Sequence, residues 1–235
     1  NMEEEKIKNR RENVKAWIKN PENLFLVALI LFAFFIRLYY FLITKNQALW
    51  WDEAEYMSTA KGFAGILGNE YHLALNRIPG FPLLVSLFYR IGISDEVTLR
   101  VLLVFIPSII VITLMYFMLT SMYSDKRIAL ISTAIFTVLW EHVFYSNRFH
   151  TENLSLIFEF LAIFVIFRVY IKNQNFYFIK SRYALFWVSL FSILSILFRS
   201  ANMIFIPVIV LFLIIINFYK LPEKFRIPSA IGIII

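Results

Sequence analysis

The segment LWWDEAEYMSTAKG, residues Leu49 to Gly62, places two adjacent carboxylates, Asp52 and Glu53, directly after a pair of tryptophans. A partly desolvated carboxylate can act as a general base, and two together can contribute to a site for a hard divalent cation. The same residues can also simply begin a helix, because Asp52 as N-cap with Glu55 three residues later has the pattern of a capping box. Spacing alone leaves both interpretations open.

The face of the predicted helix favours the catalytic interpretation. At about 100° per residue, one side of the helix carries Asp52, Glu53, Tyr56, Ala60, Phe63 and Leu67. The acids therefore point with the apolar stripe, and we predict Asp52 and Glu53 as catalytic residues and Tyr56 as a substrate contact. The expected element is a short amphipathic helix at the outer membrane interface, with Trp50 and Trp51 as anchors.

A second polar group lies in the segment SNRFHTEN, residues 146–153. It contains three side chains able to bind an anion or move a proton: Arg148, His150 and Glu152. The alternative is an ordinary loop in which Thr151 or Asn153 caps the following helix. Glu159 follows Glu152 by seven residues, on the same helical face and about 10 Å deeper. An ionisable group at that depth is a candidate functional residue.

Arginines are the third group of candidates. Arg37, Arg100 and Arg199 each lie toward the outer end of an apolar segment, where snorkelling would explain any one of them. Together with Arg148 they indicate an anionic head group, because the planar guanidinium suits phosphate. We predict Arg100, Arg148 and Arg199 as substrate-binding residues. No metal motif is visible, so a divalent cation at Asp52 stays a possibility without a defined ligand set.

Composition identifies the solvent of this chain. Of its 235 residues, 60% are hydrophobic and 18% aromatic, whereas soluble domains are usually about 45–50% apolar. The sequence therefore predicts a membrane protein. The net charge of +7 is spread over the segments between apolar runs and not along one soluble face, which argues against nucleic acid as a partner. The absence of cysteine excludes disulfides and thiolate metal sites.

Six apolar segments approach the length of about 20 residues that crosses a bilayer. They are Leu24–Ile43, Val97–Met122, Ile128–Tyr145, Leu154–Ile171, Tyr183–Phe198 and Met203–Tyr219. We therefore predict a basic tail over residues 1–23 and an all-α, polytopic transmembrane bundle over residues 24–235, with a first outer loop over residues 44–95. Because a seventh apolar run is only begun at residues 227–235, we expect the N-terminal part of a larger protein.

Basic residues in alternate connections set the predicted orientation. The first 20 residues are rich in Lys and Arg, and the basic residues of the later connections on this side are Lys126, Arg127, Lys172, Lys180, Arg182, Lys220, Lys224 and Arg226. The positive-inside rule places this set in the cytoplasm. We thus expect a multi-pass protein of the cell membrane whose N-terminus is cytoplasmic. All the candidate site residues then share the extracytoplasmic face.

The order of these features resembles a known family. The chain begins with a basic tail and a span ending RLYYF. These are followed by WWDEAEYMSTAKG, RIPGFPLLVSLFYRIGISDEVTLRVLLVFIPS, YSNRFHTENLSLIF and LFRSANMIFIPVIV. This series of segments is similar to polyprenyl-phosphate-sugar-dependent glycosyltransferases of the GT-C fold. Protein O-mannosyltransferases and lipid A aminoarabinose transferases belong to this group. The resemblance covers nearly the whole chain, and DEAEY is its most specific piece.

The resemblance implies a GT-C-type bundle, a polyprenyl-phosphate-linked sugar as donor and an extracytoplasmic acceptor that is a protein, lipid or glycan. It implies Asp52 as general base, Glu53 as a group that orients the acceptor or binds a cation, and Arg100 as a phosphate ligand. Two other functions stay open: a transporter or flippase of an anionic lipid-linked substrate, and a noncatalytic binding subunit. A transporter would need polar groups or broken helices near the midplane, and the second, third and fifth apolar segments read as nearly uninterrupted.

Overall fold

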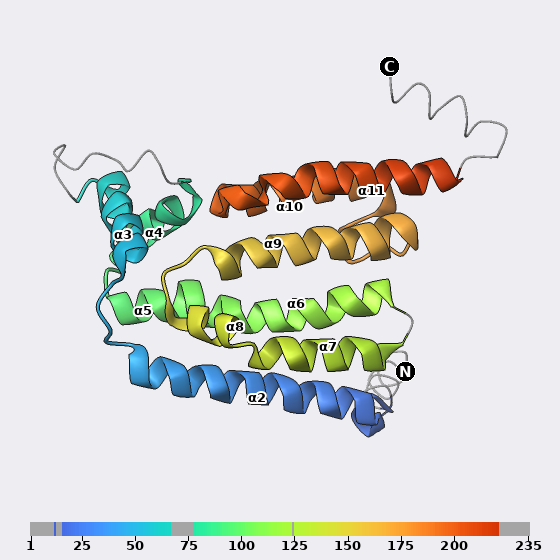
Figure 1. Cartoon of the computed structure of the whole chain (residues 1–235), viewed down its shortest axis with the longest axis horizontal. Helices are drawn as coiled ribbons and strands as arrows, with labels where there is room; N and C mark the ends of the chain where they lie inside the picture. The colour runs from blue at the N-terminus through green and yellow to red at the C-terminus, as the bar shows by residue number, and fades with distance from the viewer. Residues whose placement is uncertain (1–11, 13–15, 67–77, 124, 221–235) are drawn as a thin grey trace, which may run out of the picture.

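The structure of the chain is a computed structural model that describes residues 12, 16–66, 78–123 and 125–220 (Figure 1). Over these residues the chain is helical and forms no strand, apart from one isolated bridge between Phe176 and Ile179. Three predictions concern segments outside the described residues: most of the basic tail, the position of Leu67 on the acidic helix, and the apolar run at residues 227–235.

Five described helices are long and apolar enough to cross a membrane: Pro21–Thr44, Glu96–Met122, Glu152–Ile171, Ser181–Phe198 and Ser200–Phe218. Their parts are α2 (Pro21–Thr44), α5 (Glu96–Arg100), η1 (Val101–Phe105), α6 (Ile106–Met122), α9 (Glu152–Phe164), η3 (Val165–Ile171), η4 (Ser181–Tyr183), α10 (Ala184–Phe198), η5 (Ser200–Ile204) and α11 (Phe205–Lys220). Each overlaps a predicted apolar segment. The chain is thus an all-α, multi-pass membrane protein, as its apolar runs predict.

The third predicted span is broken, and the prediction of an uninterrupted helix there is wrong. It consists of α7 (Lys126–Val138) and α8 (Trp140–Phe144) with the 3-10 turn η2 (Tyr145–Asn147), and the two parts meet at an angle of 60°. No Pro or Gly causes the break. Instead, the carbonyl of Thr137, which a continuous helix would pair with the amide of residue 141, accepts a hydrogen bond of 3.2 Å from Nη1 of Arg37.

Arg37 itself lies on α2 and is only 1% exposed. Its guanidinium donates to the carbonyls of Ala33 and Thr137 within the bundle. The sequence groups Arg37 with the arginines expected to snorkel toward the outer surface. That prediction is wrong for Arg37. The side chain stays inside, where the break in the helix leaves the Thr137 carbonyl able to accept its hydrogen bond.

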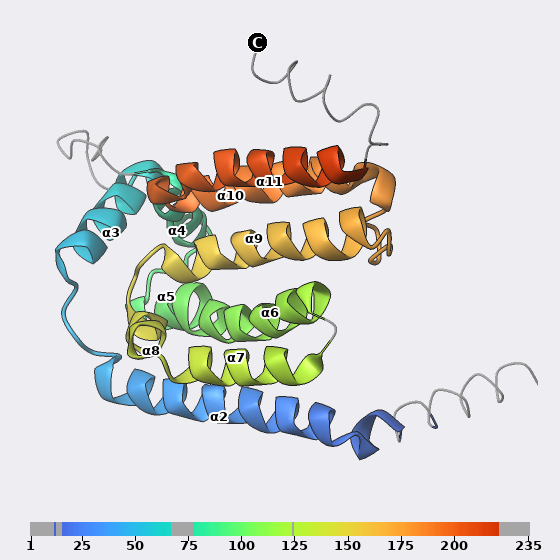
Figure 2. The same ribbon diagram turned by 45° about the vertical axis from the view of Figure 1, so that its right-hand side comes forward.

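The helices lie side by side, with α2, α7, α6, α9 and α10 following one another across the bundle in both views (Figures 1 and 2). The start of α2, the α6–α7 connection and the α9–α10 connection lie at one end, which we call the basic end because of its lysines and arginines. Helices α3, α4, α5 and α8 lie at the opposite end, the site end. The alternation of basic and site-bearing connections predicted from the sequence is thus seen in the fold.

Two of the short helices at the site end pack on each other, α3 (Trp51–Ala64) and α4 (Gly80–Arg90). A helix is present where the sequence predicted one after the tryptophans, and its buried side chains are Glu53, Tyr56, Met57, Thr59 and Ala60. This face packs on α4 and the core. The predicted stripe therefore faces the bundle at Tyr56 and Ala60. A separate exposed apolar stripe lies on α4 at Leu83 and Leu87 and continues to Ile91, just after the helix ends. Helix α4 itself was not predicted.

A hydrophobic cluster joins α3 and α4 to the transmembrane helices beneath them. Its buried members are Tyr56, Met57, Ala60, Phe81, Val85, Tyr89, Leu99, Leu103, Val104, Phe149, Leu154 and Phe198. Phe81 lies between the rings of Tyr56 and Phe149, with centroids 5.5 and 6.3 Å away. Burial of this much aromatic surface is the main favourable term that fixes the acidic helix over the bundle.

Helix α5 begins at a side-chain cap. Both the amide and the hydroxyl of Thr98 donate to Oδ2 of Asp95 at 2.7 Å. These hydrogen bonds hold the pKa of Asp95 below its ordinary value. Because the helix start is fixed, the position of Arg100, five residues later, is fixed as well.

Candidate functional site

Helix α3 begins at Trp51, and Trp50 occupies the N-cap position with extended backbone angles. Asp52 is therefore the second residue of the helix and not its cap, so the capping interpretation of Asp52 and Glu55 is wrong. The residue that completes the helix start is Glu53, whose Oε2 accepts a 2.7 Å hydrogen bond from the backbone amide of Trp50. A function for Asp52 other than capping is left open by this geometry.

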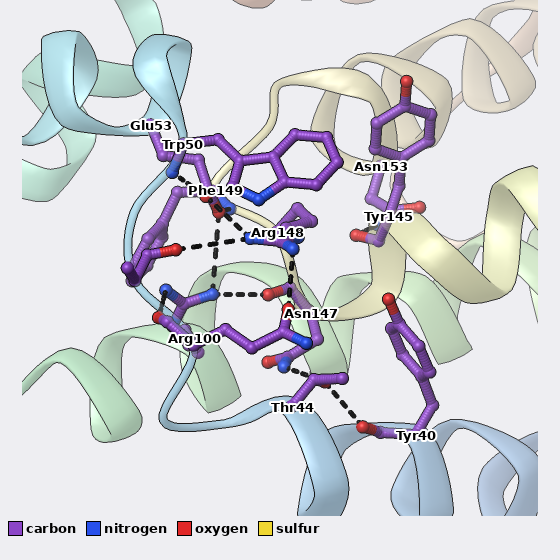
Figure 3. Close-up of polar contacts among 12 residues, drawn as sticks. Tyr40, Thr44, Trp50, Glu53, Arg100, Tyr145, Asn147, Arg148, Phe149 and Asn153 are labelled. Carbon is purple, nitrogen blue, oxygen red and sulfur yellow. Dashed lines mark hydrogen bonds and ion pairs between the residues drawn. The ribbon is translucent and has the colours of Figure 1, made fainter.

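Glu53 lies at the centre of a buried polar cluster and is 0% exposed (Figure 3). Its Oε1 accepts from the backbone amide of Phe149 at 2.7 Å and lies 3.5 Å from Nη1 of Arg100. Its Oε2 lies 3.1 Å from Nη1 of Arg148. One carboxylate thus meets two guanidinium groups and two backbone amides.

The two arginines of this cluster point inward. Arg100 is 0% exposed, and its guanidinium donates to the carbonyls of Asn147 at 2.6 Å and Gln47 at 3.3 Å. Arg148 is 4% exposed, donates to Oε1 of Gln47 at 2.6 Å, and lies 4.1 Å from the ring of Trp50. We call Glu53, Arg100, Arg148 and Gln47 the Glu53 cluster.

The Glu53 cluster connects four segments that are distant in sequence: the chain after α2, the start of α3, the end of α5 and the loop after η2. Three of the predicted site residues, Glu53, Arg100 and Arg148, are thus engaged with one another. The geometry gives them a positioning role. Because all three side chains are buried among the described residues, they expose no surface on which a substrate or a phosphate could bind.

The other five predicted residues come together elsewhere. A cavity of about 320 Å³ beside the start of α3 is lined by Asp52, Tyr56, Ile78, Tyr145, His150, Thr151, Glu152, Phe198, Arg199, Ser200 and Ala201. We call it the Asp52 cavity. Its volume falls within the range of roughly 300–1,000 Å³ usual for small-molecule sites. Its walls come from α3, the loop before α9, the first residue of α9, and the turn between α10 and α11.

Opposite charges face each other in the Asp52 cavity. Glu152 is 3.6 Å from Nη1 of Arg199 and 3.5 Å from Nδ1 of His150. The Arg199 side chain is 43% exposed, so it can meet a ligand, whereas Arg100 cannot. On the described residues, His150 Nε2 and Glu152 Oε2 are buried without a hydrogen-bond partner. Buried polar atoms of this kind mark a place where a ligand or water can bind.

A cation site at Asp52 and Glu53 finds no further support. The oxygens of Glu53 are engaged by two guanidinium groups and two backbone amides. Among the described residues, no group of three or more His, Asp and Glu side chains is arranged to hold a metal ion.

Several residues of the site were not predicted from the sequence. Tyr145, Phe198 and Ser200 line the Asp52 cavity, Gln47 belongs to the Glu53 cluster, and the Asn147 carbonyl accepts a hydrogen bond from Arg100 of that cluster. Tyr145 directly precedes the SNRFHTEN segment and Asn147 lies within it, so the signal was close at hand. Gln47 gave no such signal, because its role depends on a loop that meets residues about 50 and 100 positions further along the chain.

Comparison with known proteins adds no relative: no protein-family model, no curated protein and no solved structure matches this chain.

Proposed function

We propose that the chain is an integral-membrane glycosyltransferase that moves a sugar from a polyprenyl-phosphate donor to an extracytoplasmic acceptor. The observation that carries this proposal is the Asp52 cavity, in which a carboxylate and an accessible arginine face the same space at one end of a transmembrane bundle. The resemblance of the DEAEY segment and its neighbours to GT-C-fold transferases supports the same function. A GT-C-type arrangement of the helices is part of the proposal.

The chemistry assigns one task to each of these side chains. The acceptor hydroxyl attacks the anomeric carbon of the donor, and its proton passes to the carboxylate of Asp52. The bond from the anomeric carbon to the phosphate oxygen breaks, and its electron pair leaves with the polyprenyl phosphate. Arg199 stabilises the charge on that phosphate. His150 and Tyr56 border the cavity and are positioned to contact the sugar or the acceptor.

The position of the cavity suits a donor whose tail stays in lipid. The cavity lies at the end of the helices that are apolar enough to cross the membrane, and the turn between α10 and α11 forms one wall. A polyprenyl chain can therefore remain beside the bundle while its phosphate reaches Arg199. We place this end outside the cell and the basic end in the cytoplasm, as the distribution of Lys and Arg favours.

One observation favours the transporter instead, and that is the broken helix. Transporters use discontinuous helices near the midplane, and α7 and α8 meet at an angle of 60°. The break falls after 13 residues of α7, with only α8 and η2 remaining on the other side, so it lies toward the site end. Because the charged residues lie at that end as well, the transferase is the better supported function.

The role of Arg199 in donor binding can be tested with two variants. Arg199→Ala should weaken binding of a polyprenyl-phosphate sugar by about 1.5–3 kcal/mol, the usual worth of a hydrogen bond to a charged group. Arg199→Lys should restore binding only in part, because it lacks the bidentate fork. The measurement is donor binding by the purified protein in lipid nanodiscs. Unchanged affinity in Arg199→Ala would remove the phosphate from this cavity.

A further inference from the structure

Glu159 has no part in the chemistry proposed above, although it is an ionisable residue within a membrane-spanning helix. It lies on α9, and its carboxylate contacts Ser195 of α10 and Asn202 of η5. Groups of this kind usually carry a function, because an acid in the membrane is costly unless it is paired or used. The partners of Glu159 identify what it holds.

The contacts form a closed ring around the turn between α10 and α11. The hydroxyl of Ser195 donates to Glu159 Oε1 at 3.2 Å, and the side-chain amide of Asn202 donates to the same oxygen. The amide of Asn202 also donates to Ser195 Oγ at 2.7 Å. The backbone closes the turn, with the Arg199 amide donating to the Ser195 carbonyl at 3.0 Å and the Asn202 amide donating to the Arg199 carbonyl at 3.1 Å.

The residues enclosed by this ring form one wall of the Asp52 cavity: Phe198, Arg199, Ser200 and Ala201. Arg199 interrupts the helix, with extended backbone angles of φ −142° and ψ 114°. Phe158, the residue before Glu159, adds an apolar contact, because its ring stacks on that of Phe198 at 5.7 Å and 11°. Helix α9 therefore holds both the beginning and the end of this turn.

Two acids on one face of α9 thus fix Arg199 in different ways. Glu152 pairs with the guanidinium of Arg199. Glu159, two turns further along, accepts hydrogen bonds from Ser195 before Arg199 and from Asn202 after it. We propose that Glu159 is a positioning residue that locks the α10–α11 turn and thereby aims Arg199 into the Asp52 cavity. The role in donor binding rests on the proposed function. The lock itself does not.

The ring needs a hydrogen-bond acceptor at residue 159 and not a charge, and this distinguishes the lock from other roles. Glu159→Gln keeps an oxygen for Ser195 and Asn202, so the lock should survive. Glu159→Met keeps the approximate volume but removes the acceptor, so the turn should loosen. A role in carrying protons or cations would instead require the charge and would be lost in both variants.

The experiment uses the natural absence of cysteine. A nitroxide label on Ala201→Cys, an exposed position in the turn, reports the mobility of the turn by electron paramagnetic resonance in nanodiscs. We expect the Glu159→Gln spectrum to match that of the labelled parent and the Glu159→Met spectrum to show faster motion. In a parallel assay, Glu159→Met should bind polyprenyl-phosphate sugar about tenfold or more weakly, the loss of roughly one charge-assisted contact.

Each outcome decides the proposal. An unchanged Glu159→Met spectrum overturns the lock. Faster motion in both variants also overturns it, because the order of the turn would then depend on the charge at residue 159 and not on a hydrogen-bond acceptor. If Glu159→Met does not fold, the double variant Ser195→Ala with Asn202→Ala removes the two donors to Glu159. Slow motion of the label in that double variant would also overturn the lock. Faster motion confined to the variants that break the ring supports the lock even if the parent binds no donor, in which case only the proposed function fails.

Discussion

Glu53 is surrounded by more positive than negative charge, and this makes its removal more damaging than that of either partner. Glu53→Gln leaves Arg100 and Arg148 buried beside each other without a counter-charge, which should cost about 3–5 kcal/mol. Arg148→Met leaves Glu53 paired with Arg100 and with two backbone amides, so its cost should be smaller. Thermal unfolding of the purified variants in lipid measures the difference.

The matched double variant is Glu53→Gln with Arg148→Met. It removes one charge of each sign and should recover part of the stability lost in Glu53→Gln alone. A lower unfolding temperature for Arg148→Met than for Glu53→Gln would contradict the described charge balance and return Glu53 to the list of catalytic candidates.

At the level of single residues, the sequence predicted which side chains lie at the same end of the bundle. It did not predict which of them line the Asp52 cavity and which form the Glu53 cluster. Asp52 and Glu53 are neighbours, yet successive residues of a helix point about 100° apart. One therefore lines the cavity while the other enters the Glu53 cluster. The arginine partners of Glu53 are the last residue of α5 and a residue of the loop before α9. They lie nearly 50 and 100 residues away, and no local pattern encodes such a contact.

Helix α4 is attached to the end of α10 by a close approach at Gly80. A Cβ on Gly80 would lie 2.1 Å from the carbonyl oxygen of Leu197 and 2.7 Å from its carbonyl carbon. Gly80→Ala should therefore destabilise the protein by about 1–3 kcal/mol, the usual cost of overpacking, although alanine ordinarily favours a helix.

The matched control is Leu87→Ala on the exposed face of α4, where the side chain is 57% exposed. This change removes more atoms but creates no clash, so its effect on the unfolding temperature should be the smaller one. Equal stability of Gly80→Ala and the parent would show that α4 does not lie against the carbonyl of Leu197.

The long helices were predictable because a run of apolar residues long enough to cross a bilayer has few other stable structures. Shorter elements were not. The segment that forms α4 contains Pro79 and Pro82 and is too short to span, so it read as part of a loop. The break at Leu139 carries neither Pro nor Gly, and the Thr137 carbonyl beside it accepts a hydrogen bond from a side chain on another helix, Arg37, which no local pattern reveals.

The whole bundle has two chemically different ends, and this gives a direct test of its orientation. The chain contains no cysteine, so single cysteines report one position each. Ser94→Cys, exposed just before α5, should react with a membrane-impermeant thiol reagent on intact cells. Gln174→Cys, exposed between η3 and η4, should react only after permeabilisation. The reverse pattern would place the Asp52 cavity in the cytoplasm.

The sequence positions of the long helices and the segregation of charge were predictable for the molecule as a whole, because they follow from hydropathy and from the alternation of connections. The shape of the site was not. It depends on where the α10–α11 turn and the loop before α9 meet the start of α3, and each of these segments is held by side chains from another helix.

The central claim is that Asp52 is the general base, and Asp52→Asn tests it most directly. Because Trp50 and not Asp52 occupies the N-cap, the substitution should change stability by no more than the roughly 0.3–1 kcal/mol of a charge near the helix start. Glu55→Gln is the control, since Glu55 pairs with the indole of Trp51 at 2.9 Å outside the cavity lining and Gln can accept the same hydrogen bond.

The measurement is transfer from a polyprenyl-phosphate sugar by the purified protein in lipid, with thermal stability recorded alongside. We predict that Asp52→Asn folds normally and lowers the transfer rate by about 10²–10⁴-fold, the usual contribution of general base catalysis, while Glu55→Gln retains the parent rate. Transfer at the parent rate by Asp52→Asn would contradict the assignment of Asp52 as the base and with it the mechanism proposed for this cavity.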